Sequence, residues 1–144
     1  MLTWAILANA SKEQQVLISE LGNYMGMTFQ MRDDYLDIIG GDKTKSTFSD
    51  IQEWQQTYFT NYVFEKWTPE QKELLKSSMG KSLDDQQIKV LQEMFEISWA
   101  LQFGKDNILT YSEKARQVLE KTELNHEAKN SILGLIKKME KLEH

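Results

Sequence analysis

The chain of 144 residues contains no cysteine, one proline and only two histidines. Without cysteine it has neither disulfides nor thiolate chemistry. With so little proline, and with abundant Leu, Glu, Lys and Gln, we expect helices throughout. Arginine occurs only at Arg32 and Arg116, and the net charge is −5. This acidity disfavours nucleic acid as a partner.

The chain also lacks an apolar run long enough to cross a membrane. Its opening segment, 1–10, is apolar but has no basic start, so it is unlike a targeting sequence and is interpreted as the end of a buried helix. Hydrophobic residues make up 40% of the chain, an ordinary globular share, and the length suffices for one domain with its own core. We therefore expect a soluble protein, no transmembrane segment and a cytoplasmic location.

What the sequence does contain is a dense group of carboxylates within one predicted helix. At about 100° per residue, one stripe of this helix carries acids, an amide and glycines. The residues of the stripe are Gly22, Gly26, Gln30, Asp33, Asp34 and Asp37. Apolar side chains are spread almost all the way around the helix, which predicts that it is buried in a larger core.

Ionised carboxylates on a buried helix need a counter-ion. Without one, each would cost several kcal/mol or stay protonated. Oxygen ligands without cysteine favour a hard cation, and magnesium fits best because it takes one or two carboxylates, keeps water and completes its shell with phosphate oxygens. The alternative is a solvated acidic face, since an isolated DDxxD is common on exposed helices.

A polar loop with two glycines and two lysines follows the acidic helix. Gly40 and Gly41 end the helix, and Lys43 and Lys45 follow them. A lysine on a loop beside a metal–carboxylate group suits a diphosphate clamp. Taken alone, the loop is equally compatible with ordinary surface lysines.

The pattern over residues 22–51 closely resembles the second aspartate-rich region of the trans-isoprenyl diphosphate synthases, also called polyprenyl synthetases. The matching positions are Gly22, Gly26, Phe29, Gln30, Asp33, Asp34, Asp37, Gly41, Asp42, Lys45, Ser49, Asp50 and Ile51. The resemblance is less specific at 68–71, 100–103 and 112–115. It implies an all-α fold, the C-terminal half of the isoprenoid synthase helical bundle, with residues 1–141 forming the C-terminal part of a polyprenyl synthetase domain.

The resemblance implies a magnesium-dependent (Mg2+) prenyltransferase, which condenses an allylic diphosphate with isopentenyl diphosphate. Asp33 would be the direct metal ligand. Asp34 and Asp37 would hold metal-bound water or neighbouring groups. Stabilisation of the leaving diphosphate would be the main catalytic contribution.

Three further positions correspond to residues near the diphosphates in that family. Gln30 would act near the diphosphate or the reacting carbons, and Lys45 would reach the allylic diphosphate. Gln55 stands where the family usually has a second diphosphate-binding lysine, and Thr44 replaces a common glycine. Both departures bear on diphosphate affinity rather than on the fold.

The first aspartate-rich motif of that family, with its paired arginines, does not occur in the sequence. We therefore expect a partial enzyme, inactive alone, that needs the absent N-terminal half or a partner subunit. An uncovered apolar face, including the glycines of the stripe, predicts self-association as a homodimer. Two alternatives stay open: a natural small subunit of a two-chain prenyl synthase, or a non-catalytic helical interaction module. Residues 142–144 resemble the start of a cloning tag.

Capping residues indicate where four of the helices begin. The candidate caps are Ser11, Thr68, Ser82 and Asn125. The acidic pair at 84–85 follows Ser82, and the preference of acids for a helix N-terminus explains it without a metal.

Two further segments are predicted to be helical. Apolar side chains over 90–103 predict a largely buried helix that is interrupted at Gly104 and continues beyond it. Segment 54–66 has the aromatic and β-branched residues typical of a strand. We predict a helix there because no partner strand is visible and the resembling family has a helix at this place.

Overall fold

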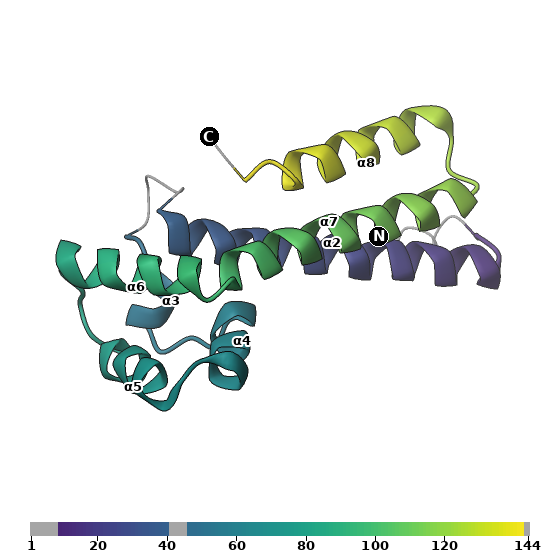
Figure 1. Cartoon of the computed structure of the whole chain (residues 1–144). Coiled ribbons are helices and arrows are strands. Elements are labelled where there is room, and N and C mark those ends of the chain that lie inside the picture. The colour runs from purple at the N-terminus through teal and green to yellow at the C-terminus, as the bar shows by residue number, and fades with distance from the viewer. Residues whose placement is uncertain (1–8, 41–45, 143–144) are drawn as a thin grey trace. The chain divides into compact units, whose positions relative to one another are not determined.

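The structure, a computed structural model, describes residues 9–40 and 46–142. Within these ranges it contains helices and no strand, so the predicted all-α fold is confirmed (Figure 1). The helices are α2 (Lys12–Ile39), α3 (Ser49–Gln52), α4 (Tyr58–Lys66), α5 (Pro69–Ser78), α6 (Asp85–Ile97), α7 (Ala100–Lys121) and α8 (His126–Met139). Among the described residues, no helix is both long and apolar enough to cross a membrane. Lys45 and most of the apolar opening segment lie outside the described residues.

The chain divides into two compact units. The first combines Met1–Gln30 with Asn107–Lys141, and the second consists mainly of Met31–Asp106. The long helices α2 and α7 therefore each contribute residues to both units.

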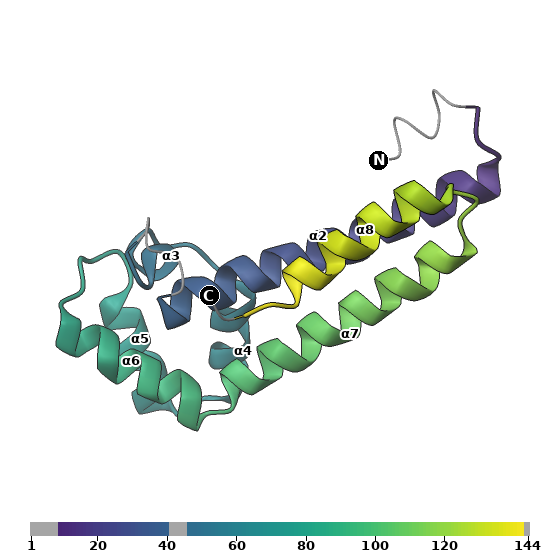
Figure 2. The same ribbon diagram turned by 90° about the horizontal axis from the view of Figure 1, so that it is seen from above.

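The core of the first unit is built where its parts of α2 and α7 run beside α8 (Figure 2). Its buried side chains are Leu21, Ala115, Val118, Leu119 and Ile136. Both carboxylate oxygens of Glu140 accept hydrogen bonds from the Arg116 guanidinium at 2.6 Å, which joins the end of α8 to α7. The side-chain oxygen of Gln14 accepts a hydrogen bond from the backbone N–H of Glu123 at 2.8 Å, which joins the first turn of α2 to the α7–α8 connection.

The core of the second unit is aromatic. Phe95 of α6 packs against Phe48 and Trp67, with ring centroids 5.7 and 5.0 Å apart. Phe59 of α4 lies against Gly104, where an added Cβ would be 2.3 Å from the Phe59 ring. Gly104 therefore allows α4 and α7 to approach closely.

The predicted interruption at Gly104 is wrong, since this residue lies inside α7. The break between α6 and α7 comes earlier, at Ser98 and Trp99, where Trp99 has a φ of 63°. The prediction of a largely buried helix over 90–103 is also wrong in part: Ile97 and Trp99 are 73% and 71% exposed, and Val90 is exposed as well. They are apolar by type but face away from the Phe95 core, and the described residues provide nothing to cover them.

Most of the predicted helix starts agree with the structure. Thr68 and Asn125 cap α5 and α8 through their side-chain oxygens, and Ser11 accepts a hydrogen bond from the N–H of Gln14. The cap of α6 is Asp84 rather than Ser82, because Asp84 forms a complete capping box with the residue three positions later. The structure therefore agrees with capping as the role of the acidic pair.

The helix predicted over 54–66 begins only at Tyr58. The preceding residues form a turn in which Trp54 has a φ of 62°. Thr57 then caps α4 by accepting a hydrogen bond from the N–H of Thr60 at 3.2 Å. This cap explains the later start.

Candidate active site

The three predicted metal-site carboxylates lie in the last two turns of α2 and have different environments. Asp33 is exposed, Asp34 is buried and Asp37 is half-buried. Because Asp34 and Asp37 are partly or wholly removed from water, their oxygens need partners within the protein. The structure provides these partners at the starts of two later helices.

Asp37 holds the start of α3. Its Oδ1 atom accepts hydrogen bonds from the backbone N–H and the hydroxyl of Ser49, at 2.9 and 2.5 Å, and its Oδ2 atom accepts one from the N–H of Asp50 at 3.2 Å. The backbone of Phe48 donates a fourth hydrogen bond, to the carbonyl oxygen of Asp37. A carboxylate at this place satisfies N–H groups that have no partner within their own helix.

Asp34 holds the start of α4 in the same manner. Its Oδ2 atom accepts a hydrogen bond from the backbone N–H of Tyr58 at 3.0 Å. The pKa of Asp34 is raised to about 6, chiefly by burial and also by the negative charges of Asp50, Asp33 and Asp37, while the hydrogen bond from Tyr58 opposes the shift. Two neighbouring acids of α2 thus fasten the segment between Ser49 and Tyr58 to the end of that helix.

The predicted diphosphate-binding residues are only partly described. Gln30 is exposed on α2, one turn before Asp33. Gln55 is exposed in the turn between the two fastened points, and its amide donates a hydrogen bond to Glu53 at 3.0 Å. Lys45 lies outside the described residues.

The carboxylates suit a hard cation only in part. Across residues 9–40 and 46–142, no three acidic or histidine side chains come together to hold a metal ion. The Oδ2 atom of Asp34 and both carboxylate oxygens of Asp37 accept hydrogen bonds from backbone N–H groups. Asp33 is exposed. Since magnesium often takes one or two protein carboxylates and fills its shell with water and phosphate, these residues fit one side of such a site.

The described residues do not bury α2 all round, and an uncovered face of the kind expected for a partial bundle is present. Phe29 is 59% exposed, and Val16 and Met27 are also exposed. A Cβ added at Gly26 would meet no atom within 4 Å, so this glycine of the stripe faces open space. Buried side chains such as Leu21 and Met31 occupy the opposite side of the helix. The face that carries Gly26, Gln30 and Asp33 is therefore uncovered in the described part of the chain.

One cation beside the acidic helix was not predicted. The ammonium group of Lys105 on α7 lies 5.7 Å from the centroid of the Tyr35 ring, and Tyr35 follows Asp34 directly. The sequence gives no signal for this contact, because the two residues are far apart in the chain. The contact between Ser49 and Asp37 does have a partial signal in the sequence, because a serine followed by an acid is common at the start of a helix.

The sequence is similar to that of a known protein family and of several of its members. A family model described as polyprenyl synthetase matches residues 1–97. A short chain isoprenyl diphosphate synthase of Methanocaldococcus jannaschii is 31% identical over 97 residues, which are 65% of this chain and 30% of that protein. A farnesyl pyrophosphate synthase of Nezara viridula is 32% identical over 109 residues, 74% of this chain and 26% of that protein.

Solved structures share the fold. A geranylgeranyl pyrophosphate synthase from Corynebacterium glutamicum, complexed with isoprenyl diphosphate and magnesium, superposes with a TM-score of 0.83 at 21% identity. The match covers 94% of this chain and 39% of that one. The chain thus spans less than half of the length of the proteins it resembles, and its helices follow the arrangement of an isoprenyl synthase helical bundle.

Proposed function

The chain belongs to the polyprenyl synthetase family, and we propose that it supplies the C-terminal, second-motif part of a magnesium-dependent prenyltransferase. The reaction would join an allylic diphosphate to isopentenyl diphosphate. The observation that carries this proposal is the arrangement at the end of α2, where exposed Asp33 stands beside two acids that hold the starts of α3 and α4.

The three aspartates of α2 have different roles in this proposal. Asp33 is the metal ligand, because it is the most exposed of the three and lies on the uncovered face with Gln30. Asp34 and Asp37 keep the following segment in place, and their remaining lone pairs can accept hydrogen bonds from metal-bound water. They are thus positioning residues as well as members of the metal site.

Magnesium bound at Asp33 would neutralise the diphosphate that leaves the allylic carbon. Gln30, one turn away on the same exposed face, can donate hydrogen bonds from its amide to a diphosphate oxygen. We assign Lys45 the role of a point charge on the allylic diphosphate. Gln55 can supply hydrogen bonds but no charge, so the diphosphate would be held less tightly than by a lysine.

The chain would act as part of a larger site. The uncovered face of α2, with Gly26 facing open space and Phe29 exposed, supports a partner that packs there. We propose that this partner carries the first aspartate-rich motif, either as the N-terminal half of the same protein or as a separate subunit. Alone, the chain should be inactive and should associate as a homodimer through this face. We expect the assembled enzyme to be cytoplasmic.

The test is a magnesium-dependent assay of isopentenyl diphosphate addition to dimethylallyl, geranyl and farnesyl diphosphate. It is run with the chain alone and with a separately expressed N-terminal half of a related synthase. We expect product only from the mixture, and we expect Asp33→Ala to abolish it while the exposed control Glu93→Ala does not.

Each of the other outcomes contradicts part of the proposal. Product from the chain alone would show that it is not a partial enzyme. No product from any mixture, with both proteins folded and associated, would instead favour a non-catalytic helical module.

A further inference from the structure

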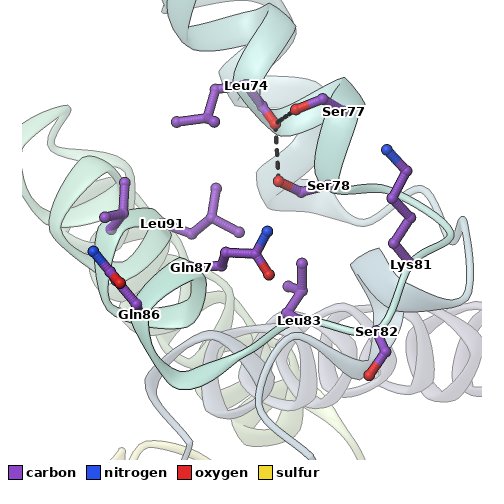
Figure 3. Close-up of a pocket in the computed structure, with 10 residues that line it drawn as sticks. Leu74, Ser77, Ser78, Lys81, Ser82, Leu83, Gln86, Gln87 and Leu91 are labelled. Carbon is purple, nitrogen blue, oxygen red and sulfur yellow. Dashed lines mark hydrogen bonds between the residues drawn. The ribbon is translucent and has the colours of Figure 1, made fainter.

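A pocket of about 380 Å3 lies between α5 and α6 in the second unit (Figure 3). The lining residues come from the end of α5, the connecting loop and the first half of α6. None of them belongs to the acidic group on α2. The pocket volume is within the range of about 300–1,000 Å3 that is usual for small-ligand sites.

The loop that connects α5 and α6 donates hydrogen bonds to α3. The N–H of Gly80 donates to the carbonyl oxygen of Ile51 at 3.0 Å, and the N–H of Leu83 donates to the side-chain oxygen of Gln52 at 3.2 Å. The indole of Trp54 lies directly against Gly80, where an added Cβ would overlap it. Because the connecting loop is fixed in this way, a ligand need not order it, which lowers the entropic cost of binding.

One side of the pocket is apolar. Leu91 lines the pocket and is buried, and Leu74 of α5 also lines it (Figure 3). Leu74 and Val90 of α6, a further lining residue, are each 41% exposed. These side chains leave hydrocarbon in contact with water. A ligand with an apolar body would cover them and gain stability from the area removed from water.

Several polar groups of the lining are already hydrogen-bonded within the protein. The hydroxyls of Ser77 and Ser78 both donate to the carbonyl oxygen of Leu74, at 2.8 and 2.9 Å (Figure 3). The side chain of Gln87 belongs to the capping box of Asp84. These groups therefore contribute little to the recognition of a ligand.

Among the described residues that line the pocket, Lys81 alone is charged. Its ammonium group favours a negatively charged head group. The acids Asp84 and Asp85 begin α6 directly after the lining loop, and their charges oppose a ligand with several negative charges. The charge pattern thus matches a single negative charge better than a diphosphate.

We propose that this pocket binds a small amphiphile that has a hydrocarbon body and a single carboxylate head. The carboxylate pairs with Lys81, and the hydrocarbon covers Leu74 and Val90. The site is separate from the carboxylates of α2 and does not depend on the prenyltransferase function. It would be a second ligand site of the chain.

The test uses NMR spectra of the 15N-labelled chain titrated with octanoate, octanol and octylamine below their micelle concentrations. We expect octanoate to shift amide signals within residues 74–91 and to bind about tenfold more tightly than octanol or octylamine. Lys81→Met, which keeps the hydrocarbon stem, should weaken octanoate binding about tenfold and leave octanol unchanged. The matched control, Lys89→Met, alters an exposed lysine of α6 outside the lining and should change neither ligand.

Several outcomes would overturn the proposal. Signals in 74–91 that stay unchanged with octanoate would remove the site. Equal binding of octanoate and octanol, or an unaltered affinity in Lys81→Met, would remove the carboxylate contact. Tighter binding of geranyl diphosphate at the same residues would show that the head group is misassigned.

Discussion

The carboxylate of Asp37 accepts hydrogen bonds from both the backbone N–H and the hydroxyl of Ser49, twelve residues later in the chain. Together with the contact between Asp34 and Tyr58, it fastens the segment from Ser49 to Tyr58 to the end of α2. The acids that the sequence pattern predicts to bind metal thus also support the local fold.

This relationship predicts that Asp37→Ala lowers the stability of the metal-free chain. Three hydrogen bonds to Ser49 and Asp50 would be lost, at a cost of about 1–3 kcal/mol. Urea denaturation in a chelator measures the change. Ser49→Ala should cost less, since it removes only the hydroxyl contact. An unaltered midpoint for Asp37→Ala would show that the contact contributes nothing to folding.

Magnesium should stabilise the chain only when a diphosphate is present. Asp33 provides one carboxylate, and the diphosphate provides the additional oxygens that the ion requires. We expect the melting temperature to rise with magnesium and inorganic pyrophosphate together, but not with either alone. Asp33→Ala should abolish the rise, and the exposed control Glu93→Ala should retain it. A full rise in the Asp33 variant would exclude this residue as a ligand.

Asp34 should make stability depend on pH in the metal-free chain. Its folded pKa of about 6 lies above its ordinary value, so protonation favours the folded state. The contribution is complete below the unfolded pKa and is lost as the pH rises through about 6. Asp34→Asn keeps an acceptor for the Tyr58 N–H without the charge. It should stabilise the chain at pH 8 by about 1 kcal/mol, after allowance for solvent screening, and have little effect near pH 4. Denaturation at the two pH values measures this; equal effects would contradict the assigned shift.

Two glycine substitutions should have opposite effects. An alanine Cβ at Gly104 would lie 2.3 Å from the Phe59 ring, so Gly104→Ala should destabilise by about 1–3 kcal/mol. At Gly134, on α8, an added Cβ meets nothing within 4 Å, and Gly134→Ala should stabilise by about 0.5–1 kcal/mol through helix propensity. Thermal or urea denaturation of both variants provides the comparison, and a change of the same sign in both would contradict the packing at Gly104.

A substitution at Gly26 should affect the folding of the chain and its assembly with a partner in opposite directions. Because a Cβ there meets open space, Gly26→Ala should stabilise the isolated chain by about 0.5–1 kcal/mol. If a partner packs closely on this face, the same methyl group should reduce activity in the two-component assay. Stability and activity are both measured on this one variant. Undiminished activity would show that the partner does not pack against Gly26.

Patterns of short range were sufficient to predict the helices and several of their starts. Thr68 and Asn125 act as caps because their partners lie only three residues away. The position of Asp33, Asp34 and Asp37 within one helix followed from spacing in the same way. Contacts between residues far apart in the chain could not be predicted in this way. Gly104 was predicted to break a helix, but it lies inside α7 and leaves room for Phe59, forty-five residues away in the sequence.

The exposed face of α2 shows a second limit of sequence patterns. Phe29 and Met27 are apolar by type, which predicted burial, yet burial also requires a neighbour to cover them. The spacing of apolar residues along a helix indicates which side chains could be buried once every neighbouring helix is present. It does not tell whether the cover belongs to the same chain.

The close contact between Gly104 and Phe59 has a consequence for how this protein can change during evolution. The two positions share one small volume, so neither can gain a larger side chain unless the other becomes smaller or the backbone shifts. In related chains, residues at these two places should therefore vary together, with small against large. The combined size of the two side chains in a related protein would then indicate how closely its α4 and α7 approach each other.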